Sequence, residues 1–152
     1  MVLKISLPIL TFLIAFLGGL SNSFTDWSWY ESLEQSSLRP PNYIFGIVWP
    51  ILYTLMAVVS FLQAKLIYKV YIAQLILNGA WSWIFFAHQA LTLALFDIII
   101  LIILNVIILH KLWTNNSYVS FFLYLPYVLW ISFASYLNAN IQIKARTAIL
   151  QD

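Results

Sequence analysis

Charged residues and cysteine are what this sequence has least of. Only 8% of its 152 residues are Asp, Glu, Lys or Arg, 63% are hydrophobic, and none is cysteine. This amount of polar side-chain surface is too small to cover a soluble globule of this size. The composition therefore indicates an integral membrane protein. The lack of cysteine excludes disulfides, thiolate catalysis and cysteine-ligated metal sites. A dispersed net charge of +2 excludes the basic footprint of a nucleic-acid-binding protein.

Long apolar stretches, separated by charged or turn-forming residues, fill most of the chain. A hydrocarbon core about 30 Å thick needs about 20 apolar residues per helix. The stretches predict spanning helices at 5–20, 41–66, 71–90, 93–112 and 119–141. Three of the four connections are short, so consecutive helices should be antiparallel neighbours. We therefore expect an all-α membrane protein, with residues 1–152 forming a single transmembrane domain built as a five-helix bundle.

The one long connection, residues 21–40, is rich in aromatic residues. Asp26 or Ser28 can N-cap a short helix in it. The aromatic residues that follow are Trp27, Trp29 and Tyr30. Loops of this length in compact proteins are often lids or binding elements, whereas aromatic residues at headgroup level are typical of an interfacial belt. Both interpretations, a lid and a belt, stay open.

Polar and aromatic residues on three predicted helices fall at one depth. With a rise of about 1.5 Å per residue, Trp49 lies about 12 Å, Trp81 about 14 Å and Trp130 about 16 Å in from the long-loop side. Asn78 should point into the bundle, because an amide in hydrocarbon lacks partners; it either bonds another helix or contacts a ligand. The full stripes are Phe45, Trp49, Tyr53 and Met56; Asn78, Trp81, Ser82 and Phe85; and Tyr127, Trp130, Ala134 and Asn138. Facing inward, they would enclose an aromatic-walled cavity.

The ionisable residues match no catalytic or metal-binding pattern. His88 and His110 lie at opposite membrane faces, and neither has a second ligand at His-x-x-x-His spacing, so we expect no metal site. No Ser-His-Asp arrangement or Walker loop is present. Arg39 and His88 lie on the long-loop side, where they can meet an anionic group of a ligand at the cavity mouth.

Two weaker patterns concern topology and assembly. Four basic residues on the N-terminal side against three on the other favour a cytoplasmic N-terminus. Ala15 and Gly19 form a small-xxx-small pair that would let another helix approach.

The residues in these stripes, with others around them, also carry a family resemblance. They are Trp29-Tyr30 and Leu33; Pro40-Pro41, Phe45, Val48-Trp49, Leu52-Tyr53 and Met56; Asn78, Trp81-Ser82 and Phe85-Phe86; Asp97; and Pro126-Tyr127, Trp130, Phe133-Ala134 and Tyr136-Leu137-Asn138. In this order the chain resembles the translocator protein family, also called tryptophan-rich sensory proteins or peripheral-type benzodiazepine receptors (TspO/MBR). We expect a bacterial member.

The resemblance implies a commonly dimeric five-helix bundle that binds porphyrins and aromatic drugs beneath the first loop. Its ligand-contacting positions correspond here to Tyr30, Trp49, Asn78 and Trp130. For some bacterial members it also implies degradation of protoporphyrin in light by pocket tryptophans. Two features depart from the family. The family's usual Lys-Pro-Ser-aromatic run before Pro-Pro is replaced here by residues 35–39. The cholesterol-binding pattern, in which Leu or Val, Tyr, and Lys or Arg follow at short spacing, also fails, because Tyr136 lies too far from Lys144. We therefore expect no high-affinity sterol binding.

The sequence therefore predicts a membrane receptor or sensor for a flat, partly anionic aromatic ligand such as a porphyrin or haem, with no obligatory cofactor. The expected ligand-binding residues are Tyr30, Trp49, Tyr53, Asn78, Trp81, Ser82, Trp130, Ala134 and Asn138, with Arg39 and His88 at the mouth. Two alternatives remain: a photo-oxidative porphyrin-degrading enzyme with Trp49 and Trp130 as catalytic candidates, and a tetrapyrrole or lipid transporter, although no duplicated halves are visible. We expect a homodimer surrounded by lipid in a bacterial cell membrane.

Overall fold

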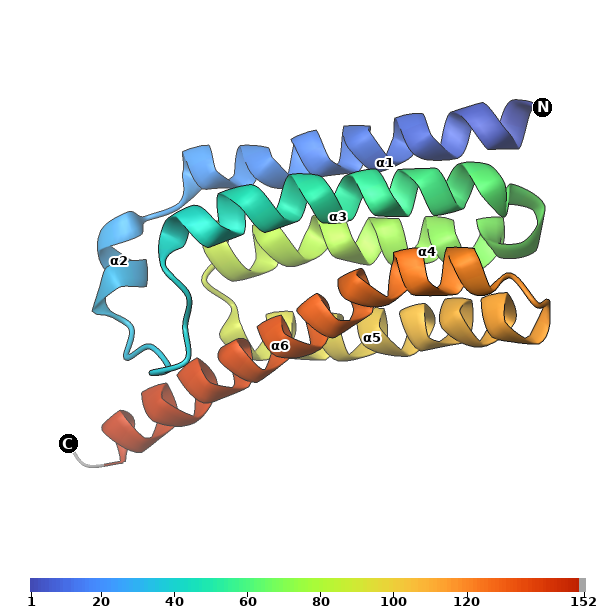
Figure 1. The fold of residues 1–152 in the computed structure, drawn as a ribbon. Helices are drawn as coiled ribbons and strands as arrows, with labels where there is room; N and C mark the ends of the chain where they lie inside the picture. The colour runs from blue at the N-terminus through green and yellow to red at the C-terminus, as the bar shows by residue number, and fades with distance from the viewer. Residues whose placement is uncertain (151–152) are drawn as a thin grey trace.

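The computed structural model describes residues 1–150 as a bundle of helices (Figure 1). The long helices are α1 (Val2–Leu20), α3 (Asn42–Leu62), α4 (Ala64–Ser82), α5 (Leu91–Thr114) and α6 (Tyr118–Ile149). The first connection holds a 3₁₀ turn, η1 (Ser21–Phe24), and the short helix α2 (Trp27–Ser32), and α4 continues into a π-helical turn, η2 (Trp83–Ala87). Residues 1–150 contain no strand. The expected fold, five spanning helices with a short helix in the first loop, is confirmed.

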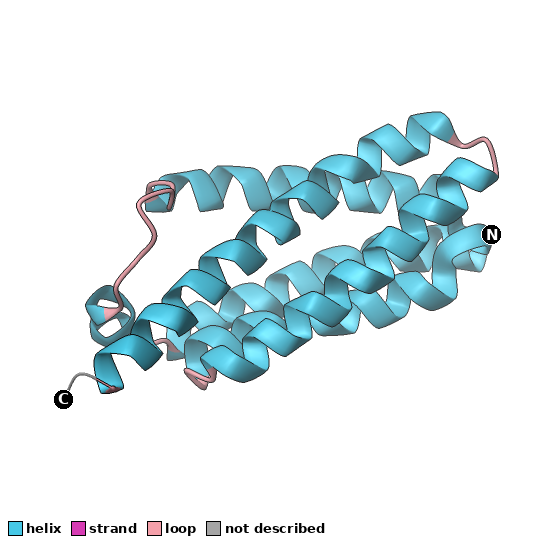
Figure 2. Cartoon of the chain, turned by 90° about the horizontal axis from the view of Figure 1, so that it is seen from below, coloured by secondary structure: helices cyan, strands magenta, loops and turns pink. Residues whose placement is uncertain are grey.

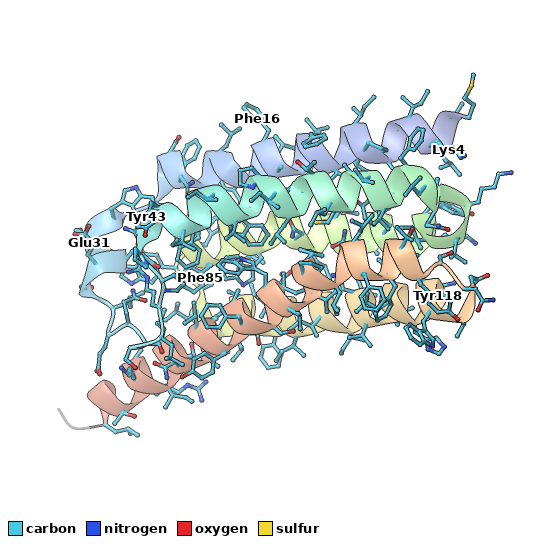
Figure 3. The ribbon with its side chains drawn as sticks, viewed as in Figure 1. Lys4, Phe16, Glu31, Tyr43, Phe85 and Tyr118 are labelled. Carbon is cyan, nitrogen blue, oxygen red and sulfur yellow. The ribbon has the colours of Figure 1, made fainter. Side chains whose placement is uncertain are left out.

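Each long helix can cross a membrane by its length and apolar composition. Large apolar side chains also cover the outside of the bundle. Phe16 on α1 and Phe96 on α5, for example, are more than 60% exposed, and Phe16 points away from the other helices in Figure 3. Such a surface suits lipid tails rather than water. The chain is therefore an integral, multi-pass membrane protein.

The five long helices form a closed ring around the core. Going round it, α1 packs on α3, α3 on α6, α6 on α5, α5 on α4, and α4 on α1. Helix α6 runs diagonally across the bundle and continues beyond it to the level of the loop that holds α2 (Figures 1 and 2). Glu31 and Tyr43 lie at this end, and Lys4 and Tyr118 lie at the other (Figure 3).

The break expected between residues 66 and 71, beside Lys65 and Lys69, was wrong. The turn between α3 and α4 is Gln63 alone, and both lysines lie exposed in α4. Charged residues marked the membrane edge without ending the helix, because lysine is a good helix former and its long side chain reaches water from a helix end. Gln63 also donates its Nε2–H to Ser120 Oγ of α6 (3.0 Å), which ties this turn to the neighbouring helix.

The same end of the bundle also holds a Schellman turn, which follows α5. Asn116 adopts φ 56°, its N–H bonds Trp113 O (3.0 Å), and the Ser117 N–H bonds Leu112 O (2.9 Å). Helix α6 then runs to Ile149, well past the expected end at residue 141. Its polar extension, residues 142–147, continues the helix because Gln, Lys and Arg have high helix propensity.

Glycine sets the distance between α1 and α4. A Cβ atom on Gly79 would lie only 3.1 Å from Ile14 Cγ2, and a Cβ on Gly18 would meet the Gly79 backbone at 3.9 Å. The missing side chains let the two helices approach closely. This contact holds α1 against the side of α4 that carries the candidate site.

Candidate ligand-binding site

A cavity of about 510 Å³ lies between the α2 loop and the adjoining half of the bundle. Its walls come from all five long helices. The loop covers it through Trp27, Tyr30, Gln35 and Arg39. The volume falls in the range of small-molecule pockets, about 300–1,000 Å³.

The structure brings the sequence-predicted residues together around this cavity. Trp49 from α3, Trp81 from α4 and Trp130 from α6 all line it. The remaining predicted ligand-binding residues line it as well, namely Tyr30, Tyr53, Asn78, Ser82, Ala134 and Asn138. Three helices therefore turn their aromatic stripes inward, as the spacing predicted.

The π-helical turn η2 shapes the aromatic wall near the loop. Trp81 stacks on Phe85, with ring centroids 4.9 Å apart and planes at 23°. Phe86 meets both rings, at 5.9 Å from Trp81 and 4.8 Å from Phe85. In a regular α-helix, consecutive residues such as Phe85 and Phe86 point about 100° apart. The wider π-helical turn lets both side chains line the cavity.

A chain of buried hydrogen bonds forms the cavity floor. Tyr53 donates its hydroxyl to Asn78 Oδ1 (2.6 Å), and Asn78 Nδ2 donates to the hydroxyl of Tyr127 (2.8 Å). Tyr127 in turn donates to Gln74 Oε1 (2.9 Å). Asn78 thus bonds two other helices, as the first interpretation expected, and it also lines the cavity.

Two indole N–H groups beside the cavity lack partners. Nε1 of Trp81 and Nε1 of Trp130 are buried without a hydrogen-bond acceptor among the described residues. Buried donors are normally satisfied, so each such group needs an explanation. An acceptor atom of a ligand or a water in the cavity would supply one.

Arg39 is the only charged residue among the described residues that line the cavity. Its guanidinium lies over the Tyr30 ring, 5.2 Å from the centroid, and its Nε donates to the Tyr30 hydroxyl (3.2 Å). It also donates to Asn42 Oδ1. These contacts fix one positive charge at the loop end of the cavity.

His88 was wrongly placed at the cavity mouth. It does not line the cavity, and its side chain is exposed. The reason is the chain reversal after η2: the His88 N–H bonds Trp83 O (2.9 Å), and Gln89 turns the backbone with φ 55°. Only Arg39 therefore supplies the positive charge expected there.

The loop over the cavity is ordered by contacts within α2 and by contacts with α6. Asp26 caps α2 by accepting from the N–H groups of Ser28 (3.0 Å) and Trp29 (3.2 Å). The Ser28 hydroxyl donates to the same carboxylate, and these bonds lower the pKa of Asp26. Further along, Lys144 of α6 pairs with Glu34 (2.9 Å) and donates to Gln35 O (3.0 Å).

Some lining residues were missed or interpreted differently from sequence. Ala15 and Gly19 were interpreted as a helix-packing pair, and they line the cavity. Gly46 and Pro50 on α3 were not singled out, because a small residue carries no chemical signal of its own. Asn138 lines the cavity, yet its amide, oriented to satisfy both atoms, donates to Leu91 O (3.3 Å) and accepts from the Leu95 N–H (3.2 Å) of α5.

Comparisons with known proteins agree on one family. The family model described as the TspO/MBR family matches residues 7–144. The tryptophan-rich protein TspO of Archaeoglobus fulgidus is 34% identical over 148 residues, which cover 90% of this chain and 94% of that protein. The human translocator protein is 32% identical over 72% of this chain and 70% of its own. The tryptophan-rich sensory protein of Cereibacter sphaeroides is 26% identical over 72% of each chain.

Proposed function

Because the chain belongs to the TspO/MBR family, we propose that it is a membrane receptor or sensor that binds porphyrins and related flat aromatic ligands in the cavity under the α2 loop. One observation carries the proposal: tryptophans from three different helices converge on one cavity of ligand size. The name of the Cereibacter sphaeroides relative, tryptophan-rich sensory protein, supports a sensory role.

The chemistry of the cavity suits a porphyrin along its length. Aromatic walls can cover the faces of a macrocycle by offset or edge-to-face stacking. The free indole N–H groups of Trp81 and Trp130 can donate to acceptor atoms of the ligand. At the loop end, Arg39 can pair with a carboxylate, which stays close to water. A ligand with an apolar ring and acidic substituents at one edge matches aromatic walls inside the cavity and a positive charge at its loop end.

Removing one aromatic wall tests the proposal. We expect Trp49→Ala and Trp130→Ala each to raise the Kd of protoporphyrin IX about tenfold, since an aromatic contact and its buried area contribute on the order of 1.4 kcal/mol. The measurement is a titration of the porphyrin absorbance band in detergent. Trp113→Ala is the matched control, because Trp113 lies at the far end of α5 and does not line the cavity. Unchanged affinity in both cavity variants would overturn the proposal.

Light-dependent porphyrin degradation is the second candidate. The Trp49 ring lies 5.6 Å from the Tyr53 ring, and Tyr53 is hydrogen-bonded to Asn78, so an oxidisable pair adjoins the ligand position. Illumination of the protein with protoporphyrin in air separates the two functions. New absorbance bands that depend on the protein and disappear in Trp49→Phe would indicate catalysis, and bleaching that is equal in both proteins would indicate binding alone.

A further inference from the structure

The loop-side half of α3 forms a loosely packed part of the cavity wall. In the described segment 42–51 of α3 no residue is buried, whereas the buried residues of this helix all lie beyond it, from Leu52 to Ser60. At the far end α1 and α3 are in contact, with Lys4 of α1 5.7 Å from the Phe61 ring centre of α3. Helix α3 is thus well packed at its far end and less buried beside the cavity.

Three residues in this part of the wall face both the cavity and the outside. Gly19, Gly46 and Pro50 line the cavity and are also exposed. A Cβ atom added at Gly19 or at Gly46 would have no neighbouring atom within 4 Å, so the space beside each is open. We call the gap bordered by these three residues the lateral opening.

The lateral opening reaches the depth of the hydrocarbon. Pro50 lies eight residues after Asn42, which is about 12 Å along the helix. Its neighbours Ile47 and Ile51 are each 54% exposed and do not line the cavity, as expected for side chains that face lipid. Pro50 also has no N–H for the Gly46 carbonyl, so the helix is weakened at this point.

The loop side is closed by comparison. Tyr30 packs on Phe86 with ring centroids 5.4 Å apart, and Tyr30 and Leu33 cover a buried cluster of Phe85, Ala94 and Ile141. The Lys144–Glu34 ion pair and the Arg39–Tyr30 contact add to this closure. A ligand entering from water would have to separate these groups, and one entering between α1 and α3 would not.

We propose that ligands enter and leave the cavity sideways from the bilayer through the lateral opening, and that Gly19 and Gly46 keep it wide enough for a flat ring. This inference rests on the proposed binding function. An amphiphilic porphyrin in a membrane holds its ring in the hydrocarbon and its carboxylates at the headgroups. That orientation already matches a cavity whose one charge, Arg39, lies at the loop end.

The experiment measures exchange rates rather than affinity alone. Protein in lipid vesicles is mixed with protoporphyrin IX, and binding and release are followed by stopped-flow porphyrin fluorescence. Gly46→Phe and Gly19→Leu should each slow both association and dissociation at least tenfold. Ile47→Phe is the matched control on α3 and should leave both rates unchanged. Unchanged rates in both glycine variants would overturn the proposal.

A second arm closes the loop route. The chain has no cysteine of its own, so Glu34→Cys with Lys144→Cys gives a unique pair that a short bis-maleimide can join across the present ion pair. If the cross-linked protein binds and releases the porphyrin at wild-type rates, lateral entry is supported. If cross-linking blocks binding and release, lateral entry is overturned. Absence of equilibrium binding in wild type would contradict the proposed function itself, whereas normal binding with insensitive rates contradicts only the lateral opening.

Discussion

At the scale of single residues, the buried polar side chains fix the contacts between helices more specifically than the many apolar ones. Beyond the cavity floor the hydrogen-bonded chain continues from Gln74 through Asn105 to Tyr124, and these residues, like Tyr127, are almost completely buried. In hydrocarbon no water replaces a lost partner. Each of these bonds therefore links two helices at a point where the alternative is an unsatisfied group.

Tyr127→Phe tests this network. The change leaves Asn78 Nδ2 without its acceptor and removes one of the two donors to Gln74 Oε1, so we expect a loss of about 1–2 kcal/mol in unfolding free energy. Thermal unfolding in detergent, followed by circular dichroism, measures it. Tyr118→Phe removes a similar bond to Asn116 that is exposed, and should change stability by less than about 0.5 kcal/mol. Equal losses in the two variants would contradict the prediction.

The cap of α2 should depend on pH. The folded-state pKa of Asp26 is lowered chiefly by the Ser28 hydroxyl and then by the Trp29 N–H. Because this pKa is lowered, the ionised carboxylate contributes its full stabilisation of α2 at pH values above the unfolded-state pKa. The contribution is lost as the pH falls through the folded-state pKa. Hydrogen exchange at residues 28–32, corrected for intrinsic rates, should therefore quicken in acid. Asp26→Ala should exchange fast at every pH, and an identical acid response in that variant would refute the assignment.

At the scale of elements, glycines and prolines decide how closely the helices approach. Gly18 and Gly79 bring α1 against α4, whereas Gly46 and Pro50 leave the loop-side half of α3 loosely packed. The same residue type thus has opposite effects. The space beside Gly79 is occupied by Ile14 of the neighbouring helix, whereas the space beside Gly46 is empty.

Gly79→Leu should separate α1 from α4. Even a Cβ atom there lies 3.1 Å from Ile14 Cγ2, so a full side chain should cost about 1–3 kcal/mol through overpacking. Ala73→Leu is the control on the same helix, because Ala73 is exposed and a larger side chain should be accepted. Denaturation in mixed micelles compares the two. A Gly79→Leu protein as stable as Ala73→Leu would show that the contact is not tight.

At the scale of the whole molecule, α6 joins the bundle to the loop over the cavity. Its polar extension continues past the other helices, where Lys144 contacts Glu34 and Gln35. Both partners of the ion pair are partly exposed, with side-chain exposures of 31% and 74%. The contact should therefore position the loop and add little to overall stability.

Lys144→Gln separates these two effects. We expect the unfolding free energy to change by less than about 1 kcal/mol, as for other exposed ion pairs. Hydrogen exchange in residues 33–37 should nevertheless quicken several-fold, because the loop loses its contact with α6. Arg146→Gln removes the same charge from the same extension and should leave the loop unchanged. If both variants loosen the loop equally, Lys144 has no specific role.

The sequence by itself determined the class of fold, the five spans and the inward faces of Trp49, Trp81 and Trp130, because apolar length and helical period are local properties of the chain. It could not place the helix ends, since lysines and glutamines continue a helix beyond the membrane edge. Only the tertiary structure decided that His88 does not line the cavity, that Asn78 joins three helices, and that Gly19 and Gly46 line the cavity. A glycine or an amide acquires its role from the atoms that face it, and those come from distant parts of the chain.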